Sequence, residues 1–313
     1  MNGAAKATGV STAPAWLGWC CPYCAAPLSE RSNGLYCAEE ERWFATDRGI
    51  HRLLTEERRR EIQPFLELYQ RVRRDEGWCA EPGLPDVPAA HRHAAIWGRR
   101  AQHFRRGLAL AGQALGGGPW RVLEVGAGCA WASAQLAALG HQVVAADVNL
   151  DADDGLAAAE RLGPPGCFPR AEAEMDALPL APSLFDLVLA AGSLHYPPRL
   201  LRTLVELRRV TRRGGALLVL DSPVFRRRPD GEAMVEQRMK DHARRYGLDV
   251  PRETQSGYLV LGELPGMFRS AGWRLELRGW PHSLREHARD LVEVLSRGRR
   301  TARFPILLAR RDG

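Results

Sequence analysis

The chain has 313 residues, of which 45% are hydrophobic and 26% charged, and its formal net charge is +7. This is ordinary globular composition, with enough length for one large domain and a small one. No apolar run approaches the roughly 20 residues of a membrane span, and the seven cysteines are too few and too unevenly placed for a disulfide scaffold.

Residues 1–18 are predicted to form a disordered tail. Lys6 is the one cation of this segment, and no apolar core precedes Ala13, so the segment has little in common with a signal peptide. We therefore expect a cytoplasmic protein with no membrane partner.

The positive net charge raises the question of nucleic acid as a partner. Acidic residues interleave with most of the basic runs, as in Glu56–Glu61, and this pattern favours solvated helix faces. Three arginine stretches could nevertheless hold a phosphate: Arg99-Arg100, Arg105-Arg106 and Arg226–Arg228.

Four of the cysteines lie between Cys20 and Cys37. Cys21 and Cys24 form a Cys-x2-Cys knuckle, and Cys37 follows a hairpin signal at Asn33-Gly34. With the stretch Trp43–Leu54, this pattern resembles the zinc-ribbon segments in front of some bacterial methyltransferases and in the small zinc-ribbon activator of tRNA methyltransferases. The resemblance covers roughly residues 19–54 and implies a small β module over residues 19–56 with one structural Zn²⁺.

The fourth zinc ligand departs from that pattern. Glu40 stands where the family has its fourth cysteine, so the predicted ligand set is Cys21, Cys24, Cys37 and Glu40. Structural zinc prefers four Cys or His ligands, which leaves Cys20, Glu41 and His51 as alternatives. The competing interpretation is a ribbon without metal, held together by its apolar residues.

Two helices and a linker should follow, over residues 57–117. Apolar residues recur at three- and four-residue spacing between Thr55 and about Gly77. Residues 82–88 form a proline- and glycine-rich linker. A second helix should run from about Ala89 to Leu115 and end at Gly116.

From residue 118 to the end, near-continuous apolar strands alternate with helices. This pattern predicts an α/β fold with a parallel sheet covered on both faces. The segments that we expect to be strands are Val122–Val125, Val143–Ala146, Phe185–Ala190, Ala216–Asp221, Trp273–Leu277 and Phe304–Ala309. Residues 224–260 form an insertion, expected to cover the substrate.

The strand Val122–Val125 contains Glu124 and leads into the turn Gly126-Ala127-Gly128. The next expected strand ends in Asp147. A strand, a glycine-rich turn, a helix and a second strand that ends in a carboxylate form a nucleotide-binding unit.

This arrangement resembles the class I S-adenosylmethionine (SAM)-dependent methyltransferases, and methyltransferase type 11 in particular. The resemblance implies a Rossmann-like sheet of seven strands and SAM as cofactor. It also implies that Glu124, Gly126, Ala127 and Gly128 line the methionine part of SAM. Asp147, with Val148 beside it, is expected to bind the ribose diol.

A third loop, Ala173–Leu180, matches the family stretch whose acidic residue accepts a hydrogen bond from the adenine amino group. The match gives this role to Glu174 and places Met175 against the adenine. Asp176 is the competing acidic residue.

The fourth loop, Ala191–Tyr196, should face the transferred methyl group, with Ala191 against the cofactor. It lacks the Asn-Pro-Pro-Tyr motif of amino-methylating enzymes and the Pro-Cys motif of cytosine-C5 enzymes. It resembles instead the Ser-x-His-Tyr loop of enzymes that act on small molecules. His195 and Tyr196 are therefore the catalytic candidates, with His195 either a general base or a residue that only shapes the pocket.

Three functions follow as hypotheses. The first is SAM-dependent methyl transfer to a small-molecule acceptor through an O, N or C atom. The second is methylation of a base in ribosomal or transfer RNA, with the ribbon and the arginine stretches on the phosphate backbone. The third is a partner-binding protein that keeps the SAM fold without catalysis.

Overall fold

The computed structural model describes residues 14–164, 166–247, 256–278 and 300–312. The expected tail falls largely outside this range. Its last residues are ordered, since the Trp16 ring packs edge-on against Phe185, with ring centroids 5.9 Å apart. In the described part of the chain, no helix has the length and apolar character needed to cross a membrane.

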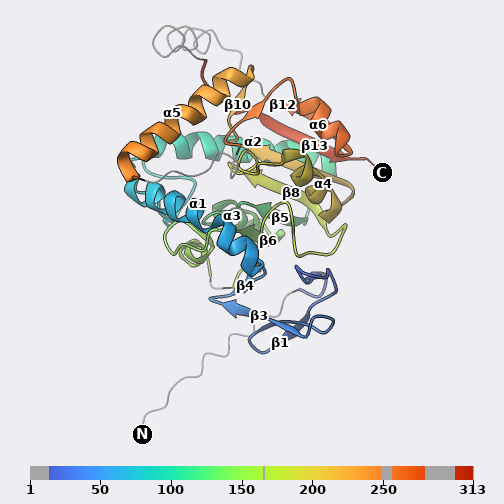
Figure 1. Ribbon diagram of the computed structural model, residues 1–313. Helices are drawn as coiled ribbons and strands as arrows, with labels where there is room; N and C mark the ends of the chain where they lie inside the picture. The colour runs from blue at the N-terminus through green and yellow to red at the C-terminus, as the bar shows by residue number, and fades with distance from the viewer. Residues whose placement is uncertain (1–13, 165, 248–255, 279–299, 313) are drawn as a thin grey trace.

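The N-terminal module is an antiparallel meander of β1 (Ser29–Arg31), β2 (Gly34–Cys37), β3 (Arg42–Asp47) and β4 (Ile50–Arg52). The turn between β1 and β2 contains Asn33, as the sequence predicts. Strand β4 pairs in parallel with β7 (Arg170–Glu172). The module therefore extends the central sheet, at the lower edge of the molecule in Figure 1.

The central sheet has the order β1-β2-β3-β4-β7-β6-β5-β8-β9-β13-β12. Its parallel strands are β5 (Arg121–Val125), β6 (Gln142–Asp147), β7, β8 (Phe185–Ala191) and β9 (Thr211–Leu220). Strands β12 (Trp273–Arg278) and β13 (Ile306–Arg311) complete it, and β13 runs antiparallel to both neighbours. Seven of these strands, in the order β7-β6-β5-β8-β9-β13-β12, form the predicted Rossmann-like sheet. The fold class is confirmed.

Helices cover both faces of this sheet. The helices α2 (Ala94–Leu115) and α3 (Trp131–Ala138) contribute buried side chains to one core, with Trp97, Phe104 and Leu136 among them. The helices α4 (Leu200–Val210) and α6 (Leu264–Ser270) pack on the other core, where Phe268 points inward. Burial of each such side chain contributes about 1.5–3 kcal/mol.

Two further helices lie outside the two faces described above. Helix α1 (Glu56–Asp75) begins at the N-cap Thr55, whose side chain accepts a hydrogen bond from the Arg58 backbone N–H. Helix α5 (Arg228–Tyr246) belongs to the predicted insertion, with the short pair β10 (Val224–Phe225) and β11 (Leu259–Val260). The C-terminal end of α5 lies against the second half of α1, where Tyr246 packs with Leu68.

Two local predictions need correction. Between β6 and β7 the alternation of strands and helices predicts a helix over Asp154–Arg161, but only the short 3-10 helix η1 (Leu156–Arg161) forms there, and the Asp154 carboxylate instead pairs with Arg73. The second long helix begins at Ala94, five residues later than expected from Ala89.

Candidate functional site

A cavity of about 520 Å³ opens at the carboxyl ends of β5, β6 and β8. The sheet order reverses between β5 and β8, which is where ligands of open α/β sheets bind. Helix α1 forms one wall of the cavity, α2 contributes Trp97 and Arg100, and the loops after the strands form its floor. Its volume is in the range of small-molecule sites.

Most of the predicted cofactor residues line this cavity. Those that do are Gly126, Ala127, Gly128, Asp147, Val148, Glu174, Met175 and Ala191, and the competing acidic residue Asp176 lines it as well. The predicted catalytic residue Tyr196 lines it as well, whereas Glu124 and His195 are not among the lining residues.

The turn after β5 requires glycine at its first position. Gly126 has a φ of +61°, and a Cβ there would lie 2.4 Å from the Cβ of Ser193 and 3.0 Å from the Met175 side chain. The backbone therefore approaches the loop after β8 more closely than any other residue would allow. Gly126 therefore fixes the path of the turn that lines the cavity, at the position expected to contact the cofactor.

Asp147 is anchored by the two backbone segments next to it. One oxygen of its carboxylate accepts a hydrogen bond from Gly128 N at 2.6 Å, and the other accepts from Asn149 N at 2.7 Å. Burial raises the pKa of this carboxyl above its usual value. An ionised carboxylate has about four acceptor positions, so Asp147 keeps capacity for a diol.

Glu124 has a structural position behind the cavity. Its carboxylate accepts hydrogen bonds from the backbone N–H and the hydroxyl of Ser133, at 2.7 and 2.5 Å, and so joins β5 to the first turn of α3. Burial raises its pKa to about 7. The contact holds the glycine-rich turn in place from behind.

The acidic residues after β7 pair with arginines from other segments of the chain. Arg58 on α1 makes two hydrogen bonds to the Glu174 carboxylate, at 2.6 and 2.8 Å. The Asp176 carboxyl lies 3.6 Å from Arg202 and 3.8 Å from Arg199, and burial raises its pKa. No motif pointed to Arg58, because it lies 116 residues from Glu174 in sequence.

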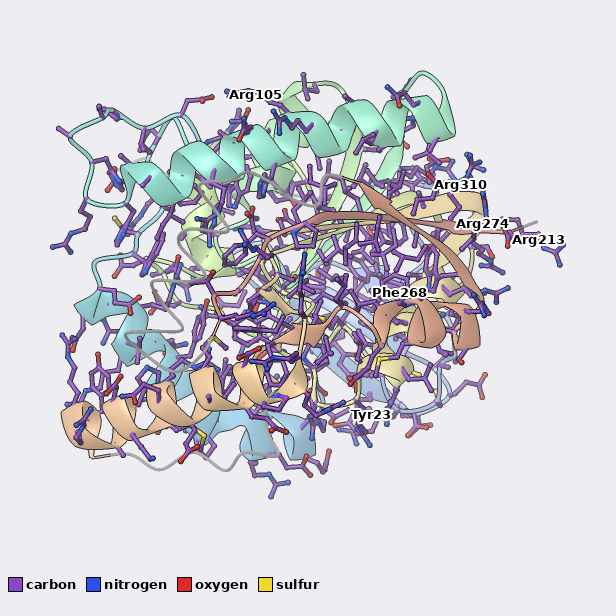
Figure 2. All side chains as sticks on the ribbon, turned by 90° about the horizontal axis from the view of Figure 1, so that it is seen from above. Tyr23, Arg105, Arg213, Phe268, Arg274 and Arg310 are labelled. Atoms are coloured by element: carbon purple, nitrogen blue, oxygen red, sulfur yellow. The ribbon has the colours of Figure 1, made fainter. Side chains whose placement is uncertain are left out.

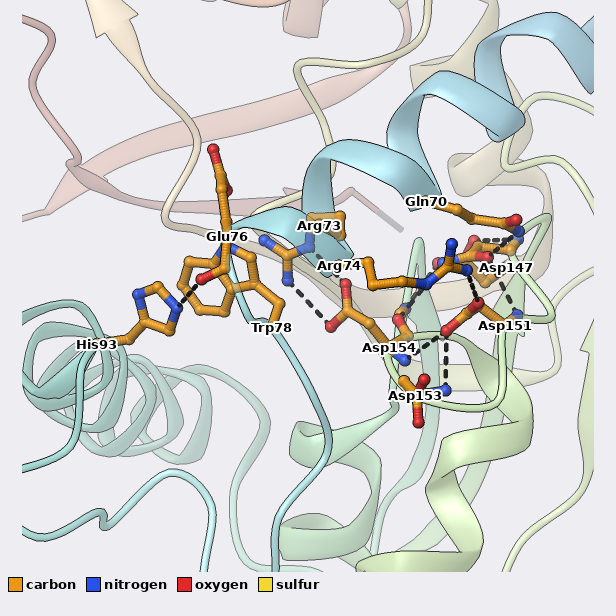
Figure 3. A network of polar contacts seen from close by, with 12 residues as sticks. Gln70, Arg73, Arg74, Glu76, Trp78, His93, Asp147, Asp151, Asp153 and Asp154 are labelled. Carbon is orange, nitrogen blue, oxygen red and sulfur yellow. Dashed lines mark hydrogen bonds and ion pairs between the residues drawn. The ribbon is translucent and has the colours of Figure 1, made fainter. Parts of the chain in front are cut away.

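The other half of α1 is fastened to the loop after β6 (Figure 3). Arg73 makes a bidentate ion pair with Asp154, and its second hydrogen bond measures 3.0 Å. Gln70 donates to the Asn149 side chain at 2.8 Å. Helix α1 is therefore bound to the cofactor loops at both ends of the cavity.

The two catalytic candidates in the loop after β8 lie in different surroundings, since only Tyr196 lines the cavity. His195 is buried behind the cavity, with its ring nitrogen 3.4 Å from the Ser222 hydroxyl, and burial lowers its pKa to about 3. Tyr196 faces the cavity and packs edge-on against Tyr69 of α1, with ring centroids 6.0 Å apart. Phe65 completes this aromatic wall, 6.2 Å from Tyr196.

The predicted metal residues form a cluster of three thiols. The sulfur atoms of Cys21, Cys24 and Cys37 lie within 4.8 Å of one another, a donor set that suits a thiophilic metal. In the described residues no fourth His, Cys, Asp or Glu joins this group. Glu40 has an exposed side chain, although its backbone amide hydrogen-bonds the Cys37 sulfur. His51 is bonded to Thr46 at 2.8 Å instead.

Comparison with known proteins agrees with this geometry. Residues 123–219 match the family model of a methyltransferase domain. Over 148 residues the chain is 30% identical to a malonyl-[acyl-carrier protein] O-methyltransferase of Erwinia pyrifoliae, a match that covers 45% of this chain and 55% of that protein. The chain thus spans about half the length of this curated relative.

A solved structure shares the fold. It is a chain of the complex between the Haloferax volcanii Trm112 methyltransferase activator and a methyltransferase. The two chains are 16% identical and superpose with a TM-score of 0.50, over 71% of this chain and 93% of the other.

Proposed function

We propose that this chain, whose residues 123–219 match the methyltransferase domain family model, is a class I SAM-dependent methyltransferase that transfers the methyl group of SAM to a small-molecule acceptor. The observation that carries the proposal is the cavity in which the glycine-rich turn, Asp147, Glu174 and Tyr196 meet under helix α1. Bound SAM would supply an electrophilic methyl group on a sulfonium centre.

The nucleoside part of the cofactor belongs at Asp147 and at the loop after β7. We assign the ribose hydroxyls to Asp147, whose carboxylate is already oriented by Gly128 and Asn149. The adenine amino group is assigned to Glu174, with Met175 against the ring. Arg58 occupies both Glu174 oxygens with one hydrogen bond each, which still leaves acceptor capacity.

We propose that catalysis rests on positioning. A histidine with a pKa of about 3 accepts a proton poorly at neutral pH, so base assistance from His195 would be slight. Tyr196, Tyr69 and Phe65 would hold the acceptor in line with the sulfonium in a site shielded from water. The acceptor would then be a group that is nucleophilic without help, and its atom stays open between O, N and C.

A small acceptor is favoured over RNA by the way in which the arginines are used. Arg105, Arg227 and Arg228, from the stretches considered for phosphate binding, pair with Asp86, Asp230 and Glu263. Figure 2 shows Arg213, Arg274 and Arg310 gathered around β9, β12 and β13. Arg213 lies at the start of β9, the opposite end of that strand from the cavity.

The acceptor class can be tested with SAM that carries a labelled methyl group. The protein would be incubated with a small-metabolite extract and, separately, with total RNA, beside an Asp147→Ala control. Label in the metabolite fraction that depends on Asp147 supports the proposal. Label in RNA would overturn the acceptor class, and no transfer in either would overturn the activity.

For the N-terminal module we propose one structural Zn²⁺ on Cys21, Cys24 and Cys37. The three thiols converge, and the backbone amides of Glu39 and Glu40 hydrogen-bond the Cys37 sulfur, which favours its thiolate form. Bound zinc would hold the first knuckle to the end of β2. The remaining coordination position falls to water or to the exposed Glu40 carboxylate.

A further inference from the structure

One arginine in the cavity wall has no counter-ion among the residues that the structure describes. Arg100 of α2 lines the cavity, and it has no hydrogen bond or ion pair with any residue in the part of the chain that the structure describes. Its guanidinium carbon lies 4.8 Å from the ring centroid of Trp97 and 5.3 Å from that of Trp78. Arg73 of α1, which also lines the cavity, differs because it is paired with Asp154.

The nearby carboxylate of Asp221 does not pair with Arg100. Asp221 lies 2.9 Å from His103 and 3.7 Å from Arg99. Burial lowers the pKa of the Arg100 guanidinium, as expected for a cation that has lost water without gaining an anion. A desolvated cation in a cavity wall is costly unless a ligand brings the missing negative charge.

The position of Arg100 in the cavity indicates which part of a ligand it faces. A Cβ at Gly192 would lie 3.9 Å from a terminal nitrogen of Arg100, so Arg100 reaches the loop directly after β8. Its charge also acts on the Cys129 thiol, in the glycine-rich turn. Asp147 ends β6 and Glu174 follows β7, and we assigned both residues to the nucleoside. Arg100 is therefore at the end of the cavity left for the amino-acid part.

We propose that Arg100 is the counter-ion of the methionine carboxylate of SAM. The inference rests on the proposed function, since it assumes that SAM is the cofactor. The α-carboxylate is the one anionic group of SAM, and the planar guanidinium fork matches a carboxylate with two parallel hydrogen bonds. The Trp97 and Trp78 rings would keep the fork oriented while the cavity is open to solvent.

The test compares two ligands that differ only in this carboxylate, S-adenosylhomocysteine and its decarboxylated analogue. Their dissociation constants would be measured by calorimetry on the wild type, Arg100→Met, Arg100→Lys and the control Arg106→Met. Arg106 is an exposed residue of the same helix. Circular dichroism and thermal unfolding would show that each variant is folded.

The wild type and Arg106→Met should bind S-adenosylhomocysteine about ten- to a hundredfold more tightly than the analogue. Arg100→Met should lose this preference, and Arg100→Lys should keep part of it. An unchanged preference in folded Arg100→Met would overturn the inference alone, leaving the proposed function intact. Failure of the wild type to bind S-adenosylhomocysteine would overturn both.

Discussion

The Arg58 guanidinium on helix α1 makes two hydrogen bonds, of 2.6 and 2.8 Å, to the Glu174 carboxylate after β7. This contact ties the wall of the cavity to the residue that we assign to adenine. The neighbouring Arg59 makes a similar pair with Glu172 at the end of β7. Helix α1 thus follows the sheet edge that carries the N-terminal module, because β4 pairs with the same strand β7.

Loss of the Arg58–Glu174 contact should let a bound ligand dissociate from the cavity more rapidly. We expect Arg58→Met to weaken S-adenosylhomocysteine binding about threefold to tenfold, mainly through faster dissociation, because α1 is then held less firmly over the adenine end. Stopped-flow or surface plasmon resonance would measure the rate. Arg60→Met, an exposed position on the same helix, should change nothing. Tighter binding by Arg58→Met would show that Arg58 competes with adenine for Glu174.

The ion pair between Arg73 of α1 and Asp154 should stabilise the folded protein. Asp154→Ala leaves the Arg73 guanidinium, 17% exposed, without its carboxylate. Removal of one partner of such a pair costs about 3 kcal/mol, and urea unfolding would measure the loss. The adjacent Asp153→Ala breaks an exposed pair with Arg161 and should cost about 0.5 kcal/mol or less. Equal losses in the two variants would contradict this account.

Glu124 should make stability depend on pH. Its pKa in the folded protein is about 7, above the ordinary value of 4.5. Between pH 4.5 and pH 7 the folded state therefore holds a proton that the unfolded state releases. The contribution of Glu124 to the free energy of unfolding is fully present below pH 4.5 and is lost as pH rises through 7. The wild type should lose about 3 kcal/mol relative to Glu124→Gln between pH 4.5 and pH 7. Parallel pH profiles for the two proteins would contradict this, because they would show that folding leaves the pKa of this carboxyl unchanged.

Metal removal should affect the N-terminal module first. We expect about one zinc per chain in the wild type and none in Cys37→Ser, with a lower melting temperature, because the knuckle loses its cross-link. Cys167→Ser changes an exposed thiol elsewhere and should keep its zinc. Glu40→Ala discriminates between the two candidates for the fourth position, since full zinc content in this variant assigns that position to water. A wild type without zinc would favour a module held by apolar packing alone.

Sequence reasoning was most successful where a short motif fixes backbone geometry. The glycine-rich turn and Asp147 are local to two strands, so the fold class followed from the pattern, and the turn and Asp147 line one cavity as expected. Glu124 was expected against the cofactor, whereas the structure places its carboxylate on Ser133 behind the turn. The side chain of a strand residue points to one face, and the motif does not show which.

The residues that sequence reasoning missed come from distant helices. Arg58 and Arg73 reach the cavity only because α1 crosses the ends of the strands, an arrangement set by tertiary packing. Arg100 appeared only as one of several arginines that could hold a phosphate. Its distinguishing property is a half-buried charge in the cavity wall without a partner among the residues that the structure describes, and this is a property of the folded chain. The continuity of β4 with β7 was likewise invisible, since it joins residues about 120 positions apart.

The central claim is that this cavity binds SAM through Asp147. The most direct measurement is calorimetric titration of S-adenosylhomocysteine into the wild type, Asp147→Ala and the control Asp153→Ala. Micromolar binding by the wild type and the control, lost in folded Asp147→Ala, is the predicted result. A folded wild-type protein that fails to bind, or an Asp147→Ala variant that binds equally well, would contradict the account.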